Sequence, residues 1–205
     1  MLRSSYHPEV GHAGDDCPKG AMSVSPGLRH GRYPGVPYAI SSTPTGLRPG
    51  KEAIMPQSLS SVHIHLVFST KGREPFLRNE EIRKEMHAYL GGVSKKLDCF
   101  PIIVGGTEDH VHLLCRLART ISQAGWVKEI KRVSSLWIKQ REPALAAFAW
   151  QGGYGAFSVS ASAMDKTCEY IAGQQEHHKT QTFQDEYRAF LRKHGMEWDE
   201  RFVWE

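Results

Sequence analysis

The feature that most constrains the fold of this chain is an alternation between two hydrophobic periods that starts near residue 60. Residues 61–69 alternate apolar and polar side chains, as a half-buried strand does, whereas residues 78–97 carry apolar side chains at helical spacing. Two short apolar runs, FPIIVGG and HVHLLCRL, then lie on either side of a glycine-containing turn, which predicts a β-hairpin. A second segment with helical spacing, residues 122–140, and the short predicted strand GAFSVS, residues 155–160, follow. The predicted order is strand, helix, strand, strand, helix, strand.

Local signals mark the ends and the buried sides of the helices. Asn79 has the residue type of an N-cap, and so does Thr182 at the start of a C-terminal helix that Gly195 should end. Residues 162–178 predict another helix. In the second amphipathic segment, the expected buried stripe consists of Trp126, Ile130, Val133 and Trp137.

This order of elements is typical of the α+β class, and in particular of the ferredoxin-like or RRM-like split βαβ arrangement. In that arrangement, helices cover one face of an antiparallel sheet. We therefore expect residues 59–205 to form one domain, with the open face of its sheet available for a site or for nucleic acid.

Residues 1–58 have a different composition. They contain eight of the 11 prolines and eight of the 19 glycines, and they show neither hydrophobic period. Such a segment buries too little apolar surface to offset its ordering entropy, so we predict a disordered extension unless a partner orders it. Met55, just before the first strand, is an alternative start of the protein.

Charge and cysteine content exclude several classes. Residues 59–205 contain 20 Lys and Arg against 18 Asp and Glu, so affinity for nucleic acid must come from a local patch. The four cysteines form no CxxC pair, which argues against a zinc ribbon or a disulfide framework. Because the chain has no apolar run of about 18 residues and no apolar signal core, we expect a cytoplasmic protein without a membrane association.

Two histidines stand one residue apart in the predicted hairpin. Side chains i and i+2 of a strand point the same way, so His110 and His112 can converge on one metal ion or one phosphate. Glu108 and Asp109 precede them and could orient an imidazole, whereas Cys115 falls on the opposite face. Alone, the pattern favours a partly buried hydrogen-bonded pair over a ligand site.

A second histidine pair, His63 and His65, lies in the first predicted strand. Paired H-x-H elements on separate strands occur in 2H phosphoesterases, but those enzymes carry Ser or Thr two residues after each histidine. Here both second positions are histidine. A structural role in the strand is therefore the favoured interpretation of this pair.

The late helix places Tyr170 and Gln174 four residues apart and thus on one face, after the glycine-rich segment WQGGYGAFSVS. With HLVFSTKGREP, EDHVHLL and YIAGQQEHH, this segment resembles the single-tyrosine HUH transposases, including their REP-associated relatives, from about Ser60 to the C-terminus. The resemblance implies the HUH endonuclease fold and a homodimer that nicks and rejoins single-stranded or hairpin DNA at the ends of an insertion element.

The resemblance also implies roles for individual residues. Tyr170 would be the nucleophile that becomes joined to a 5′ phosphate, in its own subunit's site or in its partner's. Either His177 or His178 could replace Gln174 as the third metal ligand, although a solvated surface position is favoured for both. The ligands of a divalent ion, Mg²⁺ or Mn²⁺, would be His110, His112 and Gln174.

Basic side chains that could line a phosphate path follow the first strand and lie on the second helix. A solvated helix face explains those on the helix equally well. The full set is Lys71, Arg73, Lys128, Lys131, Arg132, Lys139 and Arg141.

Three functions are therefore compared. The first is a metal-dependent transposase, and the second is a metal-free 2H-type phosphoesterase that uses both histidine pairs. The third is a non-catalytic nucleic-acid-binding module, which is disfavoured because the predicted strands lack the aromatic clusters of RNA-recognition sheets.

Overall fold

The computed structural model describes residues 59–204, and every structural statement below refers to that part of the chain. The predicted extension and the alternative start at Met55 lie outside the described residues. The strands are β1 (His63–Ser69), β2 (Phe100–Gly106), β3 (His110–Arg116) and β4 (Gly155–Val159). The helices are α1 (Glu80–Lys96), α2 (Gln123–Arg141), α3 (Met164–Ala172), α4 (Gln174–His177) and α5 (Phe183–Lys193), with three short 3₁₀ turns.

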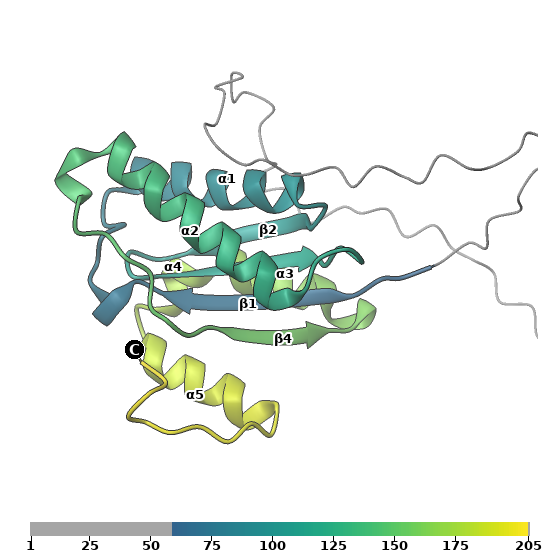
Figure 1. Cartoon of the computed structure of the whole chain (residues 1–205). Helices are drawn as coiled ribbons and strands as arrows, with labels where there is room; N and C mark the ends of the chain where they lie inside the picture. Colours follow the sequence, from purple (N-terminus) through teal and green to yellow (C-terminus); the bar gives the residue numbers. More distant parts are fainter. Residues whose placement is uncertain (1–58, 205) are drawn as a thin grey trace, which may run out of the picture.

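The four strands form one sheet in the order β2-β3-β1-β4, and every neighbouring pair is antiparallel (Figure 1). The element order and the central position of β1 and β3 confirm the predicted α+β split βαβ architecture. No helix between residues 59 and 204 is both long and apolar enough to cross a membrane.

The helix caps follow the local sequence signals. The side chain of Asn79 accepts hydrogen bonds from the backbone N–H groups of Glu81 and Ile82 at the start of α1. Thr182 accepts one from Asp185 at the start of α5, and Gly195 follows that helix with φ +62°, a left-handed conformation that suits glycine. Both predicted helix starts and the predicted stop are confirmed.

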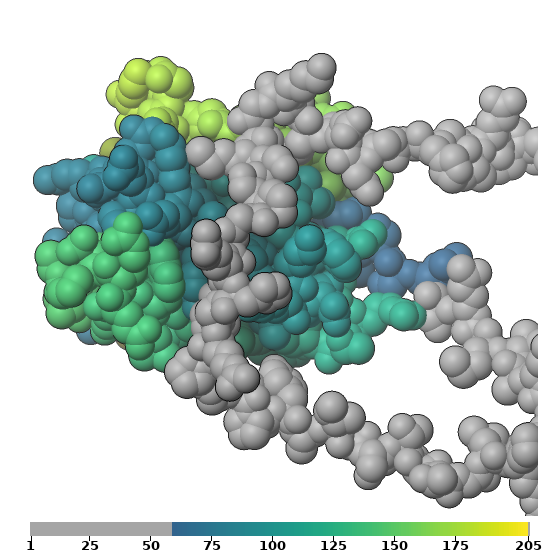
Figure 2. All heavy atoms as spheres, turned by 90° about the horizontal axis from the view of Figure 1, so that it is seen from above, coloured from purple at the N-terminus to yellow at the C-terminus, as the bar shows by residue number. Residues whose placement is uncertain are grey.

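Helices α1 and α2 cover one face of the sheet, and Figure 2 looks down on them. We call this the α1/α2 face. Its strand residues alternate with those of the other face, as the period of a strand requires. The buried side chains that β1 and β3 contribute to it are Ile64, Leu66, Phe68, Val111, Leu113 and Cys115.

The buried stripe of α2 differs from the prediction. Trp126 and Ile130 are buried as expected, but Val133 and Trp137 are only half-buried. Ser134 and Ile138 take their places. Ser134 can be buried because its hydroxyl donates to the Ile130 carbonyl at 2.6 Å and accepts from the Trp150 indole at 2.9 Å.

Helices α3 and α5 pack on the second face, so the expectation of an open face was wrong. Cys168 and Ile171 of α3 pack on β2 and β3, and apolar side chains of α5 pack on β1 and β4. Both helices carry an apolar stripe that must be buried somewhere. We call this the histidine face, and β1 and β3 contribute to it His65, Val67, His110, His112 and Leu114.

Two glycines shape the path of α3 over the histidine face. Gly105 of β2 lies opposite His112, and a Cβ there would stand 2.6 Å from the backbone oxygen of Ile171. The predicted single helix over residues 162–178 is interrupted at Gly173, where α3 ends and the short α4 begins. The interruption places Gln174 at the start of α4 with its side chain buried.

Candidate active site

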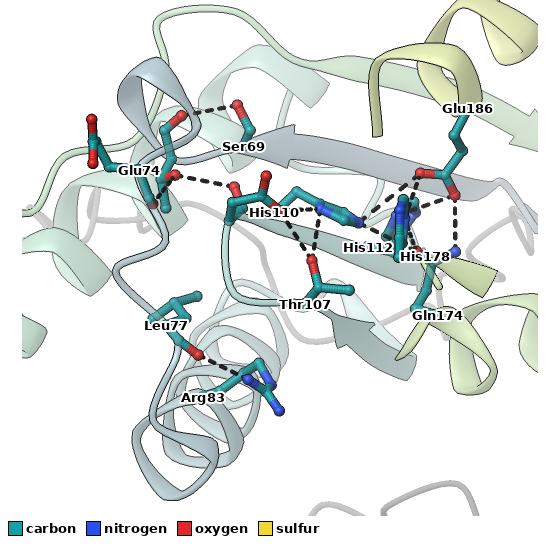
Figure 3. Close-up of polar contacts among 12 residues, drawn as sticks. Ser69, Glu74, Leu77, Arg83, Thr107, His110, His112, Gln174, His178 and Glu186 are labelled. Atoms are coloured by element: carbon teal, nitrogen blue, oxygen red, sulfur yellow. Dashed lines mark hydrogen bonds and ion pairs between the residues drawn. The ribbon is translucent and has the colours of Figure 1, made fainter. Parts of the chain in front are cut away.

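Three imidazoles meet on the histidine face. His110 and His112 come from β3 and His65 from β1, and each is at most 2% exposed. Figure 3 shows His110 and His112 beside Gln174, His178 and Glu186. Because buried polar groups need partners, the hydrogen bonds of these rings decide which nitrogen atoms are free.

His110 is oriented by the turn before it. Its Nδ1 lies 2.7 Å from Asp109 Oδ1 and 2.9 Å from the Thr107 hydroxyl. Burial works to raise the pKa of Asp109, but hydrogen bonding and charge attraction from His110 outweigh it and hold that pKa below its usual value. An ionised Asp109 accepts the Nδ1 hydrogen of His110, so the Nε2 of that ring is turned toward Gln174 and the candidate metal site.

His112 has one free nitrogen. Its Nδ1 lies 3.0 Å from His65 Nε2, whereas its Nε2 is buried without a hydrogen-bond partner among the described residues. The nearest acidic oxygen, Glu186 Oε1, is 3.8 Å away from that Nε2. Burial lowers the pKa of His112 well below its usual value, so the ring is neutral.

Glu186 enters the same space from α5 and is 3% exposed. Its Oε1 accepts a hydrogen bond from the Gln174 amide at 2.9 Å, and its Oε2 lies 3.1 Å from His178 Nε2. Burial, with a smaller contribution from Asp109, raises the pKa of Glu186 to about 8. The metal-free site therefore favours a protonated Glu186 that donates to His178.

Glu186 was not among the site residues predicted from the sequence. A signal was present, because Glu186 lies three residues after Phe183 and four before Phe190, on the side of α5 that packs against the sheet. His178 was expected to be solvated, or to replace Gln174 as a ligand. It is half-buried, with Nδ1–H donating to the Gln181 carbonyl and Nε2 3.0 Å from Gln174 Oε1.

The residues present fit a divalent cation. One ligand atom each of His110, His112 and Glu186 lies within 4.8 Å of the others. Gln174, the third ligand that the resemblance implied, lies beside them with Oε1 3.3 Å from His110 Nε2. Two imidazoles, one of them with an unpartnered Nε2 among the described residues, and the carboxyl group of Glu186 form a donor set suited to Mn²⁺ or a similar ion.

Tyr170 of α3 is half-buried next to these rings. Its ring centroid is 5.9 Å from that of His112, 6.2 Å from that of His65 and 5.3 Å from that of His177. Tyr170 also lines a cavity of about 380 Å³ together with two lysines of α3 and α5, Lys166 and Lys193. The face shared by Tyr170 and Gln174 thus looks toward the H-x-H pair of the same chain.

A family model described as "Transposase IS200 like" matches residues 58–174, which is more than half of the chain. The chain belongs to the IS200-like transposase family. A search of curated proteins found no match.

Two solved structures of low identity were also found. One is a "putative transposase" from Deinococcus radiodurans, with 20% identity, a TM-score of 0.48, and coverage of 62% of this chain and 98% of the other. The other is a REP-associated tyrosine transposase bound to a REP hairpin, with 12% identity, a TM-score of 0.45, and coverage of 60% and 72% respectively. Family membership here rests on the family model.

The basic residues selected from the sequence lie in different surroundings. Arg73 lines a cavity of about 590 Å³ beside Asp109 and His178, at the edge of the candidate site. Lys71 and Lys128 are exposed. Lys131 donates to the carbonyls of Gln151 and Gly153, and Arg132 forms an ion pair with Glu129, whereas Arg141 pairs with Glu85.

Only one member of the first-strand histidine pair reaches the site. His65 lies next to His112, whereas His63 is at the far end of β1, opposite Arg116. The 2H arrangement needs both histidine pairs to converge. The position of His63 therefore does not favour the phosphoesterase alternative.

Proposed function

We propose that this family member is a divalent-metal-dependent transposase that nicks single-stranded DNA at the ends of an insertion element and rejoins it through a 5′-phosphotyrosine on Tyr170. The observation that carries the proposal is the 5.9 Å separation of the Tyr170 and His112 rings, beside the buried carboxyl group of Glu186. A phenol nucleophile and a potential cation site thus share one enclosed region.

His110 and His112 would hold the metal ion through their Nε2 atoms. The resemblance assigns the third position to Gln174, and the positions of the side chains support Glu186 as a further oxygen ligand. When bound, Mg²⁺ or Mn²⁺ would supply a Lewis acid that polarises the scissile phosphate. Glu186 would then give up its proton, because a bound cation stabilises the carboxylate.

Tyr170 performs the covalent step in this proposal. Its phenol oxygen attacks the scissile phosphorus, the new oxygen–phosphorus bond forms, and the bond to the 3′ oxygen breaks. The 3′ oxygen leaves with a proton as a hydroxyl group, and the phenol proton passes to a base. A free phenol has a pKa of about 10, so its proton must be removed for attack, and the same cavity also carries Lys166 and Lys193. Reversal of the step rejoins the strand without ATP.

The DNA path is proposed along the edge of the site that carries Lys71 and Arg73. Arg73 faces the larger cavity together with Lys179, which supports a phosphate path beside the metal ligands. Lys128, Lys131 and Arg132 remain predicted contacts from the sequence. A protein that acts on DNA hairpins of the cell would work in the cytoplasm.

The test uses a single-stranded oligonucleotide that covers the palindromic DNA flanking the gene. Wild type with Mn²⁺ should yield a covalent protein–DNA product and a fragment with a free 3′ hydroxyl. Tyr170→Phe or EDTA should abolish both products. Cleavage that survives Tyr170→Phe and EDTA but is lost in His63→Ala would instead establish the phosphoesterase, and binding without cleavage would establish the non-catalytic module.

The resemblance implies a homodimer, and a mixing experiment tests how its sites are built. Because Tyr170 lies beside His112 of its own chain, we propose catalysis within one subunit. Tyr170→Phe and His112→Ala proteins, mixed under conditions that exchange subunits, should then remain inactive. Recovery of about a quarter of wild-type activity, as random pairing of subunits would allow, would mean that the tyrosine acts in the partner's site.

A further inference from the structure

Strand pairing brings His65 to His112. In the register of β1 and β3, His65 lies opposite Leu114 and Val67 lies opposite His112, so the two histidines are diagonal neighbours on the histidine face. Their ring centroids are 5.2 Å apart, and His65 Nε2 lies 3.0 Å from His112 Nδ1. That separation is a hydrogen bond.

The bond between these rings has two forms. A hydrogen bond between two ring nitrogens holds one hydrogen, and because burial disfavours a charged ring, each imidazole carries one hydrogen. If His65 donates from Nε2, the hydrogen of His112 is on its own Nε2. If His112 donates from Nδ1, its Nε2 keeps the lone pair.

The second form alone leaves His112 able to bind a metal ion through the nitrogen that faces Glu186, because that nitrogen must be unprotonated. At His110 the Nδ1 hydrogen is donated to a carboxylate, that of Asp109. At His112 the group in the corresponding position is the His65 ring.

The His65 ring is held independently of His112. Three aromatic rings meet it edge-on, with centroids at 6.5 Å for Phe157, 6.2 Å for Tyr170 and 5.2 Å for Phe190. Since His65 is 2% exposed, it cannot turn toward water. Its Nε2 is therefore held in place beside Nδ1 of His112.

We infer that His65 is a positioning residue that accepts the Nδ1 hydrogen of His112 and so holds the Nε2 lone pair of His112 toward the metal site. The inference rests on the proposed metal site. It gives a function to the first-strand histidine for which the sequence pattern favoured a structural role.

The first test is the tautomer of His112 in the metal-free wild-type protein, read from ¹⁵N and ¹H NMR of its imidazole. The expected result is a hydrogen on Nδ1 and none on Nε2. A hydrogen on Nε2 would overturn the inference. This measurement needs no variant to fold and no DNA to be cleaved.

The second test is calorimetric titration with Mn²⁺. His65→Phe keeps a ring of similar size but removes the acceptor, and it should weaken Mn²⁺ binding about 10- to 100-fold. His65→Gln, whose amide oxygen can accept the same hydrogen, should recover most of the loss. His63→Ala is the matched control on the same strand and should bind Mn²⁺ as wild type does.

The outcomes separate the inference from the proposed function. If His65→Phe binds Mn²⁺ as tightly as wild type, the role of His65 is wrong and the metal site stands. If wild type itself binds no Mn²⁺, the proposed function is overturned, and the inference falls with it.

Discussion

Leu113 and His112 are neighbours on β3 and both are fully buried, yet they lie on opposite faces of the sheet. Leu113 packs among apolar side chains under α1 and α2, where removal from water stabilises the fold. His112 lies among polar groups under α3 and α5, where one of its nitrogen atoms has no partner. This difference shows that β3 contributes to the hydrophobic core on one face and to the candidate active site on the other, because its side chains alternate between the faces.

The largest expected effect is on the α1/α2 face. Leu113→Ala should lower the free energy of unfolding by about 2–5 kcal/mol, because it leaves a cavity in the core. His112→Ala should change the metal-free stability less, since it removes a polar group that is buried without full hydrogen bonding. Urea unfolding of both variants in EDTA measures the contrast, and an equal loss in the two would break the comparison.

The next effect concerns the cation. Mn²⁺ at about 100 times its dissociation constant should raise the free energy of unfolding of wild type by about 2.7 kcal/mol, because the ion binds the folded state. His112→Ala should show no such increase, whereas Leu113→Ala should show the full one. Thermal or urea unfolding with and without Mn²⁺ measures this increase in each variant. Stabilisation by Mn²⁺ that persists in His112→Ala would mean that the ion binds elsewhere.

The acid dependence of stability should show a contribution from the histidines of the histidine face. The pKa of His65 is about 3 and that of His178 about 4, both lowered chiefly by burial. Below pH 6.5 the unfolded state therefore binds more protons than the folded state, so metal-free stability falls as the pH falls from 6.5 toward 4. His65→Phe should reduce this slope by about 1 kcal/mol per pH unit.

Leu113→Ala serves as the control for that slope, because it should lower stability equally at every pH. Urea unfolding in EDTA between pH 4.5 and pH 7.5, a range of about three units around the ordinary histidine pKa, measures both variants. A slope in His65→Phe as steep as that of wild type would contradict the contribution of His65 to this acid sensitivity.

The smallest expected effect is on DNA binding by exposed cations. Arg73 borders the candidate site, whereas Lys128 is exposed on α2, across the sheet from the histidines. Arg73→Ala should reduce the dependence of log K on log salt concentration by about 0.7 for single-stranded DNA, as loss of one phosphate contact does. Lys128→Ala, a change at a contact predicted from the sequence alone, should reduce it less. Fluorescence anisotropy measures both variants. A larger effect of Lys128→Ala than of Arg73→Ala would mean that the DNA contacts the α1/α2 face.

Local signals predicted most of the fold. The caps at Asn79 and Thr182 depend on hydrogen bonds within a few residues, so their positions can be predicted from sequence. Strand parity likewise separated His110 and His112 from Cys115, which is buried in the core of the other face. These features require no knowledge of the tertiary structure.

The remaining features depend on contacts between distant segments. The link between His65 and His112 requires the strand register, and the burial of Glu186 requires knowing that α5 covers the sheet. Lys131 resembled a surface cation, but the carbonyl groups it contacts come from a loop 20 residues away. The helix break at Gly173 depends on how α3 and α4 fit the histidine face, since glycine within a helical pattern is tolerated elsewhere.

Substitution of Gly105 alone should change the distance between the phenol ring of Tyr170 and the imidazole ring of His112. Progressively larger residues at this position, from alanine to serine to valine, would lift the Tyr170 helix by increasing amounts, because no side chain fits beneath Ile171. Under the proposed function, mobility of the element in living cells would then decline in steps. Mobility measured across this series of variants would show how large a displacement of Tyr170 transposition tolerates.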